Sequence, residues 1–270
     1  MINRQRILLL IVVAGVLAAA LAMYFRPGVK KSDAVLVLCG GSMRPAMEQI
    51  VERFKKATGE TVLISYGDSS EFTVQLQNTQ KGDIIVCHDP FMSWSASLGL
   101  IDQSMNVARL DVVLIVPKDN PKGIHKLEDL ARPGLRVGAG DPKYSTAGMI
   151  VDEMLRLVDY GPAVTKNFIV RTRGHQDLCN KVEMGNLDAA FVWNAVAHTV
   201  RDKVSIIVIP KDKIPAIRIE PYKDCDLRKI NVAIGVTKYA KGNDRVKRFY
   251  DFAIAQKDVF DSLGFAPVKE

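Results

Sequence analysis

Four short turns in this sequence place small or polar residues directly before an apolar helix pattern. The turns are centred on Ser42, Ser69, Ala147 and His175, and Trp193 ends an apolar run further along the chain. Each turn directs the free backbone N–H groups of a helix start toward one point, and the serines add hydroxyl donors. A tetrahedral oxyanion offers only acceptors, so neutral donors can hold it without a buried counter-charge. The alternative is that these are the ordinary capped helices of an α/β protein.

Acidic residues and a further serine accompany these turns. Asp68, Ser70 and Glu71 surround the second turn, and Asp141 begins the loop of the third. In one interpretation the acids only stabilise helix N-termini through the helix dipole. In the other, Asp68 or Asp141 accepts a hydrogen bond from a protonated oxyanion such as hydrogen phosphate, or coordinates an expanded metal centre. We treat Ser70, Asp68 and Asp141 as secondary site residues.

A histidine at the end of an apolar run raises the question of catalysis. His88 lies between Cys87 and Asp89, but no third orienting group is close in sequence, so a nucleophilic or metal site is not expected. We therefore predict a protein that is not an enzyme, with no catalytic residue, no cofactor and no structural metal ion. The four cysteines, Cys39, Cys87, Cys179 and Cys225, lack the spacing of a zinc site. They are expected either to form a disulfide or to be buried free thiols, and both alternatives stay open.

The elements that must position these residues begin with an apolar strand at 35–39. Gly40 and Gly41 permit a tight turn, Ser42 is the predicted N-cap of a helix, and Pro45 falls in its first turn. The next helix is predicted to be capped by Ser69 or Ser70. Further strands are predicted at 61–66, 83–88, 110–116, 135–139, 168–171, 189–193, 204–209 and 230–236. Further helices are predicted at 71–80, 91–100, 127–130, 149–158 and 245–260, and another follows the turn at 173–177 and ends at Met184.

This alternation of strands and helices predicts an α/β fold with mostly parallel sheets. In such sheets ligands bind beyond the carboxyl ends of the strands, which is where both serine turns are expected to lie. The sequence contains no internal repeat and no low-complexity segment.

The composition indicates a globular body behind a basic leader. The chain has 270 residues, of which 48% are hydrophobic, and a formal net charge of +7. Residues 1–30 contain four basic residues and no acid, so the excess is partly a property of the leader and argues against a nucleic-acid partner. The uncharged run at 7–25 predicts a signal peptide or a membrane anchor. In both cases the body is expected outside the cytoplasm. Whether residues 7–25 anchor it to the inner membrane stays open.

The order of these motifs resembles the periplasmic molybdate-binding proteins of ABC transporters, within the type II solute-binding superfamily. The resemblance extends from about Val35 to Phe265. It rests on Cys-Gly-Gly-Ser42-Met, on Tyr-Gly-Asp-Ser69-Ser before Glu-Phe-x-x-Gln-Leu, on Gly140-Asp-Pro…Ala147-Gly148, on the run from Glu183 to Trp193, and on Phe249-Tyr-Asp-Phe…Leu263-Gly-Phe265.

The resemblance implies which groups bind the ligand. In the family the ligand is bound by two serine hydroxyls, an alanine N–H, another backbone N–H and a tyrosine hydroxyl. In this sequence these groups fall, in that order, on Ser42, Ser69, Ala147, His175 and Trp193. Trp193 therefore replaces the tyrosine, and an indole N–H can donate but cannot accept. His175 keeps its backbone N–H and adds a titratable ring. These departures indicate a divergent branch.

The resemblance also implies the architecture and the partners. Two lobes are expected, at 34–112 with 232–270 and at 113–231, each built on a mixed, mostly parallel sheet flanked by helices. They would be joined by crossing strands at 110–116 and 230–236 and would close on the ligand like a hinge. The expected ligand is molybdate or tungstate, the expected partner is an ABC permease in the membrane, and the protein is expected to be a monomer. The alternatives are another anion such as sulfate or phosphate, a metal complex, a membrane-tethered sensor, or an enzyme on the same scaffold.

Overall fold

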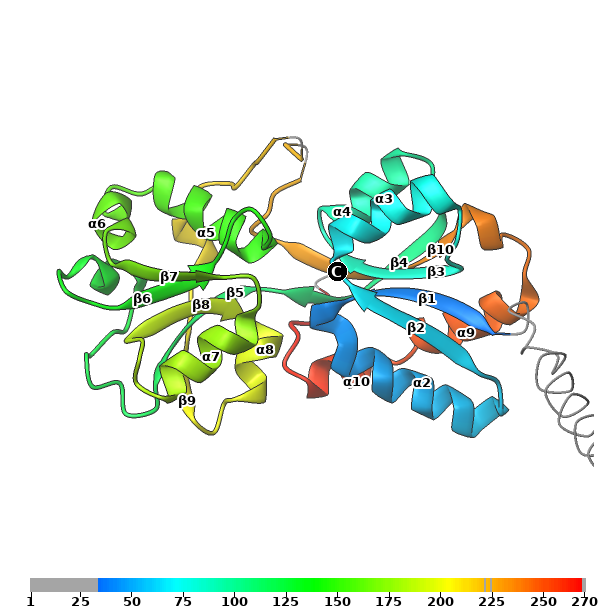
Figure 1. Ribbon diagram of the computed structural model, residues 1–270, viewed down its shortest axis with the longest axis horizontal. Coiled ribbons are helices and arrows are strands. Elements are labelled where there is room, and N and C mark those ends of the chain that lie inside the picture. Colours follow the sequence, from blue (N-terminus) through cyan, green and yellow to red (C-terminus); the bar gives the residue numbers. More distant parts are fainter. Residues whose placement is uncertain (1–33, 221, 224, 269–270) are drawn as a thin grey trace, which may run out of the picture. The chain divides into compact units, whose positions relative to one another are not determined.

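Two five-stranded sheets form the framework of the protein, for which a computed structural model describes residues 34–268 apart from 221 and 224 (Figure 1). The predicted leader at residues 1–30 lies outside the described residues. The first sheet has the order β2 (Val62–Gly67), β1 (Val35–Gly40), β3 (Ile84–His88), β10 (Ile230–Thr237) and β4 (Ile101–Leu110). The second has the order β7 (Phe168–Thr172), β6 (Val137–Gly140), β8 (Ala189–Trp193), β5 (Val112–Pro117) and β9 (Val204–Val208).

Each sheet is mixed, which confirms the predicted fold class. Strand β1 pairs in parallel with β2 and β3, and β6 pairs in parallel with β7 and β8. The remaining pairings of the described strands, β10 with β3 and β4 and β5 with β8 and β9, are antiparallel. Half of the strand pairings in each sheet are therefore parallel, rather than most of them. The parallel strands still bring their carboxyl ends to one edge.

Helices cover both faces of each sheet (Figure 1). One face of the first sheet is packed by α2 (Arg44–Thr58), α9 (Asp244–Ile254) and α10 (Lys257–Ser262), and the other by α3 (Ser69–Thr79) and α4 (Phe91–Ser97). The second sheet is packed by α5 (Thr146–Arg156) and α6 (Gly161–Thr165) on one face and by α7 (His175–Glu183) and α8 (Asn194–Thr199) on the other. Short 3₁₀ turns lie at η1 (Gly41–Met43), η2 (Leu127–Ala131), η3 (Lys211–Lys213) and η4 (Lys238–Ala240).

Helix α2 shows why the predicted pattern folds this way. Met47, Ile50 and Phe54 recur at helical spacing and are buried against the sheet, each being at most 1% exposed. Pro45 lies in the first turn, where no intrahelical N–H bond is needed. Gly59 ends the helix with φ +74°, a left-handed conformation that glycine adopts without steric cost.

Several predicted elements differ from the observed ones. Strand β4 was not predicted, because residues 101–106 are mostly polar and exposed and because a β-bulge interrupts its alternation. The predicted strand at 110–116 is divided at Asp111, where β4 ends and β5 begins. The predicted helix at 245–260 is two helices, separated at residues 255–256, and the short helices α6 and α8 were not predicted.

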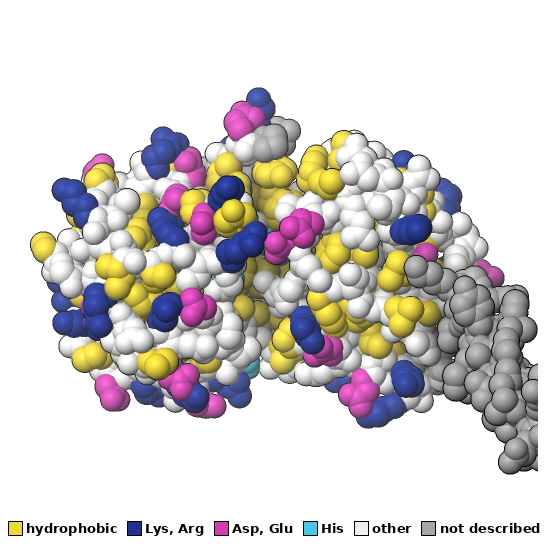
Figure 2. Space-filling model, viewed as in Figure 1, with side chains coloured by type: hydrophobic (Ala, Val, Ile, Leu, Met, Phe, Trp, Pro, Cys, Tyr) yellow, Lys and Arg dark blue, Asp and Glu magenta, His cyan; other side chains and the backbone are white. Residues whose placement is uncertain are grey.

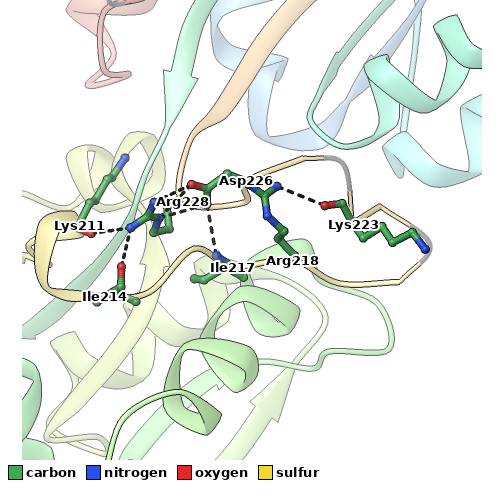
Figure 3. A network of polar contacts seen from close by, with 7 residues as sticks. All are labelled: Lys211, Ile214, Ile217, Arg218, Lys223, Asp226 and Arg228. Carbon is green, nitrogen blue, oxygen red and sulfur yellow. Dashed lines mark hydrogen bonds and ion pairs between the residues drawn. The ribbon is translucent and has the colours of Figure 1, made fainter.

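The chain passes between the sheets twice, and polar contacts join the two passages. Asp111 lies between β4 and β5, and its carboxylate pairs with Lys211 of the returning segment at 209–229. Within that segment Arg228 binds the carboxylate of Asp226 and donates to the carbonyl oxygens of Lys211 and Ile214 (Figure 3). These contacts join the end of the returning segment to its beginning, where η3 is the one regular element among the described residues of the segment. The predicted lobe boundaries stay a prediction.

An ion pair between the buried carboxylate of Asp188 and the exposed side chain of Arg136 gives a first testable prediction. The carboxylate of Asp188, which is 5% exposed, accepts from Arg136 through Nη2 at 2.8 Å and through the backbone N–H at 2.8 Å. Burial opposes ionisation of Asp188, but the hydrogen bonds and the charge of Arg136 outweigh it and hold its pKa below the usual range. We expect Asp188→Ala to lower the free energy of unfolding at pH 7 by about 2 kcal/mol, because charge-assisted bonds are lost.

The pH dependence of this effect has a definite sign. A carboxyl group whose pKa is lower in the folded protein contributes stability above its unfolded pKa of about 4 and loses that contribution as the pH falls through the folded value. The free energies of unfolding of the wild type and of Asp188→Ala, measured in denaturant, should therefore converge as the pH falls through the lowered pKa of Asp188 in the folded protein. Asp251→Ala is the matched control, since its ion pair with Lys247 is exposed and should contribute less than about 1 kcal/mol. Equal effects of the two substitutions would contradict the prediction.

Candidate functional site

A cavity of about 630 Å³ is lined by residues from elements that belong to both sheets. The first sheet contributes residues from η1, from the starts of α2 and α3, and from the end of β3, and the second contributes residues that precede or begin α5, α7 and α8. The lining residues used below are Ser42, Asp68, Ser69, Ser70, Glu71, His88, Phe91, Lys143, Tyr144, Ser145, Thr146, Arg173, Gly174, His175, Trp193 and Tyr222. Most of the predicted site residues therefore lie around one cavity.

The first wall lies at the carboxyl ends of β1, β2 and β3. In the parallel register Cys39 is level with Tyr66 on one side and Val86 on the other. Ser42 comes three residues after Cys39, Ser69 three after Tyr66, and His88 two after Val86. These three residues therefore lie at one edge of the sheet. The predicted placement of the two serine turns at this edge is confirmed by the fold.

The hydroxyl groups of Ser42 and Ser69 have no hydrogen-bond partner among the described residues, and neither hydroxyl is fully shielded from solvent. The capping prediction was wrong for both. Ser42 lies within η1, whose N-cap is Gly40, and Ser69 is the first residue of α3, whose N-cap is Asp68. Because neither hydroxyl is used in a cap, both are free to donate into the cavity.

Gly40 is needed for this arrangement. A Cβ at Gly40 would lie 2.5 Å from Oγ of Ser69, which is closer than real contacts allow. The glycine therefore lets the start of α3 approach the end of β1, and this approach brings the two serine turns together. Ser70 and Asp68 also line the cavity, whereas Asp141 does not: its Oδ1 accepts from the backbone N–H of Lys143 at 2.9 Å.

The second wall contains the start of α5. Ala147 is 1% exposed and does not line the cavity, but Ser145 and Thr146 immediately before it do. Ser145 is the N-cap of α5, and its Oγ accepts from the backbone N–H of Gly148 at 3.3 Å. Sequence reasoning assigned the donor of this loop to Ala147 and missed Ser145. The signal was present, since Ser-Thr directly before a helix pattern is typical of an N-cap.

The ring of His175 packs between Ser145 and Trp193. Its Nε2 is 3.4 Å from Oγ of Ser145, and its Nδ1 is shielded without a partner among the described residues. Burial, and then the neighbouring His88, lower the pKa of His175 to about 4, so the ring is neutral at pH 7. A shielded N–H without an acceptor costs more than a shielded lone pair, so we place the single proton on Nε2.

This tautomer determines what Ser145 can do. Its oxygen then accepts two hydrogen bonds, from Gly148 N–H and from His175 Nε2–H. A serine hydroxyl has two lone pairs and one proton, so its remaining capacity is as a donor. Ser145 is therefore a third hydroxyl that can donate into the cavity.

Trp193 closes the wall at the end of β8. It is 2% exposed, and its ring centroid lies 5.8 Å from those of both His88 and His175. Its indole N–H has no partner among the described residues and is not fully shielded, so it opens toward the cavity. That this indole N–H donates to a ligand stays a prediction.

Charged and aromatic side chains extend the cavity beyond these donors. Cζ of Arg173 lies 3.9 Å, and Nζ of Lys143 5.3 Å, from the ring centroid of Tyr144. Asp68 and Glu71 lie on the opposite wall, which the first sheet contributes. An aromatic side follows, where Tyr222 of the returning segment meets Phe91 at 5.9 Å. Sequence reasoning did not assign Arg173, Lys143 or Tyr222 to the site.

The described residues around the cavity include neither a metal-binding cluster nor a thiol with a lowered pKa. No group of three or more His, Cys, Asp or Glu side chains within residues 34–268, as far as they are described, could hold a metal ion. Burial raises the pKa of the thiols of Cys39, Cys87 and Cys179, which are buried and unpaired. On the face drawn in Figure 2, basic and acidic side chains are intermixed rather than separated by sign. No described helix is both long and apolar enough to cross a bilayer.

The sequence matches the profile of the family described as bacterial extracellular solute-binding protein over residues 35–266. The chain belongs to this family. It is accordingly a solute-binding protein rather than an enzyme, and the resemblance seen in the motifs is confirmed.

Individual relatives agree with this assignment. The chain is 25% identical over 235 residues to a putative binding protein of Haemophilus influenzae, a match covering 85% of this chain and 89% of that protein. It is 28% identical over 180 residues to the molybdate-binding protein ModA of Mycobacterium bovis, covering 66% of this chain and 67% of that protein. The modest identities place this solute-binding protein in a divergent branch.

Solved structures show the same fold. The substrate-binding domain of a putative molybdenum ABC transporter from Clostridium difficile superimposes with a TM-score of 0.69 at 20% identity, covering 87% of this chain and 99% of that one. The sulfate-binding protein SubI from Mycobacterium tuberculosis superimposes with a TM-score of 0.69 at 16% identity, covering 87% of each chain. These likenesses bear on the fold alone.

Proposed function

We propose that this solute-binding protein captures a tetrahedral oxyanion outside the cytoplasm and delivers it to the permease of an ABC importer, with molybdate or tungstate as the first candidates. One observation carries the proposal. The hydroxyls of Ser42 and Ser69 and the indole N–H of Trp193, all without partners among the described residues, line one cavity. Unpaired donors are costly unless a ligand or water binds them, and an oxyanion supplies the acceptors.

The full donor set extends this core. It comprises the two hydroxyls and the indole N–H, the backbone N–H of His175 at the start of α7, and the hydroxyl of Ser145. The backbone N–H of Ala147 at the start of α5 stays a weaker proposal, since this residue does not line the cavity. The first N–H groups of a helix lack partners within that helix, and its dipole favours a negative charge. Ser70 and Asp68 are secondary positions. Asp141 stays a weaker proposal, since its carboxylate is engaged in the loop.

In this proposal the two lobes, 34–112 with 232–270 and 113–231, close around the ligand as a hinge. Donors of the first lobe and of the second lobe then reach the same anion, which explains why neither wall holds a complete set. The closed form is what the permease would recognise. A monomer is sufficient for this mechanism.

A thermal unfolding experiment tests the proposal. The purified chain is heated alone and with molybdate, tungstate, sulfate, phosphate or ferric citrate. A ligand at 100 times its Kd should raise the free energy of unfolding by about 2.7 kcal/mol, which moves the Tm by several degrees. A shift with molybdate or tungstate alone supports the first candidates, and a shift with sulfate or phosphate moves the ligand to that anion. No shift with any oxyanion would overturn the proposal.

The size of the cavity favours a second candidate, an oxyanion carried by a small organic acid. About 630 Å³ lies within the range of cavities that hold ligands larger than a single inorganic ion. Lys143 and Arg173 would pair with the additional acid group. A Tm shift with phosphorylated hydroxy acids that exceeds the shift with every inorganic oxyanion would favour this candidate.

A further inference from the structure

His88 lines the cavity, but the proposed donor set leaves it without a role. Its Nδ1 lies 2.7 Å from the backbone carbonyl oxygen of Asp89. A carbonyl oxygen only accepts, so Nδ1 must carry a proton and donate it. In the neutral ring Nε2 is then a bare lone pair. The contact with Asp89 therefore fixes the tautomer of His88.

Nε2 of His88 is not fully enclosed by protein. His88 is 8% exposed and lines the cavity. Among the described residues Nε2 has no hydrogen-bond partner, and it is not one of the fully shielded unpartnered atoms, which belong to Glu60, Arg109 and His175. What little of His88 is accessible therefore opens into the cavity. Its position at the end of β3, beside the turns that carry Ser42 and Ser69, puts this lone pair on the same wall as two donors.

A lone pair on this wall conflicts with a ligand that offers only acceptors. The oxygens of a fully deprotonated oxyanion and Nε2 of His88 would repel each other unless a proton lies between them. We propose that the ligand complex holds one proton between Nε2 of His88 and a ligand oxygen. Molybdate, tungstate and sulfate arrive without it, so their binding takes up a proton from solvent. Hydrogen phosphate brings its own. This inference rests on the proposed oxyanion-binding function.

The charges around His88 permit such a change. The carboxylate of Asp89 is engaged by Ser93 at 2.9 Å and by the side-chain amide of Asn231 at 3.0 Å. From the other elements around the cavity, His175 lies across Trp193, Asp68 and Glu71 begin α3, and Lys143 and Arg173 come from the second sheet. Burial outweighs the attraction of Asp89 and lowers the pKa of His88, so the free protein holds it neutral at pH 7.

A bound dianion reverses this balance, because a negative charge close by favours the imidazolium form. A ligand that raises the pKa of a group binds more tightly as the pH falls through the raised value. The affinity for molybdate should therefore decrease as the pH rises above neutrality, by up to about tenfold per pH unit where one full proton is linked.

Calorimetry of the full chain tests the proposal. Molybdate is titrated at pH 7 in two buffers with different enthalpies of ionisation, and the difference in heat gives the number of protons taken up. We expect net uptake for the wild type and none for His88→Gln, since an amide does not titrate. His125→Gln, an exposed histidine outside the cavity, should retain the uptake. Tungstate and sulfate serve as parallel probes.

The outcomes separate the two proposals. Binding without proton uptake, or uptake that persists unchanged in His88→Gln, would overturn the role of His88 and leave the oxyanion function in place. Absence of binding by every oxyanion would overturn both. If hydrogen phosphate is the anion that binds, His88→Phe should weaken it about tenfold while His88→Gln retains a carbonyl acceptor and binds normally. Equal binding of phosphate by His88→Phe and the wild type would again overturn the role of His88.

Discussion

Replacing Ser42 and Ser69 together by alanine should weaken molybdate binding about a thousandfold. Each hydroxyl donates a hydrogen bond to a charged ligand, which is worth about 2 kcal/mol, so each single variant should lose about 30-fold. The stability of the ligand-free protein should hardly change, because neither hydroxyl has a partner among the described residues. Calorimetric titration gives the Kd, and thermal unfolding without ligand checks that the fold is intact.

The control for this experiment removes two hydroxyls elsewhere. Ser97 and Ser262 donate to carbonyl oxygens of their own helices and do not line the cavity. Their double alanine variant should bind molybdate with the wild-type Kd. A Ser42→Ala, Ser69→Ala protein that binds within threefold of the wild type would show that these hydroxyls do not contact the anion.

Gly148→Ala should both destabilise the protein and damage the site. A Cβ at this position would lie 2.4 Å from the carbonyl oxygen of Gly140 and 3.0 Å from the carbonyl carbon of Asp141. Both neighbours are backbone atoms and cannot rotate away, so the start of α5 must move. Overpacking of this kind costs about 3 kcal/mol. Because the N–H of Gly148 binds Ser145, the second wall should move as well, and molybdate affinity should fall at least about tenfold.

Gly174→Ala is the matched control for stability. A Cβ at Gly174 would meet nothing within 4 Å, and its φ of −114° is ordinary for alanine. The free energies of unfolding of the two variants, measured in denaturant, should differ by more than about 2 kcal/mol. Similar stabilities would contradict the view that α5 depends on close approach to the loop at Gly140.

Much of the site follows from local sequence because its donors lie at the ends of parallel strands. A short apolar run, a glycine turn and a helix pattern are all visible without the structure, and their order alone brings Ser42 and Ser69 to one edge. Trp193 follows in the same way from the end of β8. The alternation of strands and helices along the chain predicted an α/β fold, whereas its division into two sheets was implied by the family resemblance.

The parts that escaped prediction depend on contacts between distant segments. Ser145 becomes an obligate donor only because His175, thirty residues later, directs Nε2 at it. The lone pair of His88 depends on a hydrogen bond to the next carbonyl, which no residue pattern encodes. Tyr222 reaches the cavity because the returning segment folds back, and β4 was missed because its polar residues face solvent.

The ion pair of Asp111 with Lys211 has a mechanical consequence. Two separate connections between rigid bodies would permit bending and twisting in any combination. The carboxylate of Asp111 joins the outgoing connection to the returning one, and Arg109 of the outgoing strand approaches the same carboxylate at 3.8 Å. The movements of the two connections are therefore coupled. In the proposed hinge motion, such a joint bends readily and resists torsion. The two walls of donors would then meet in the same alignment at every closure, so selectivity among anions of similar charge would depend on their size.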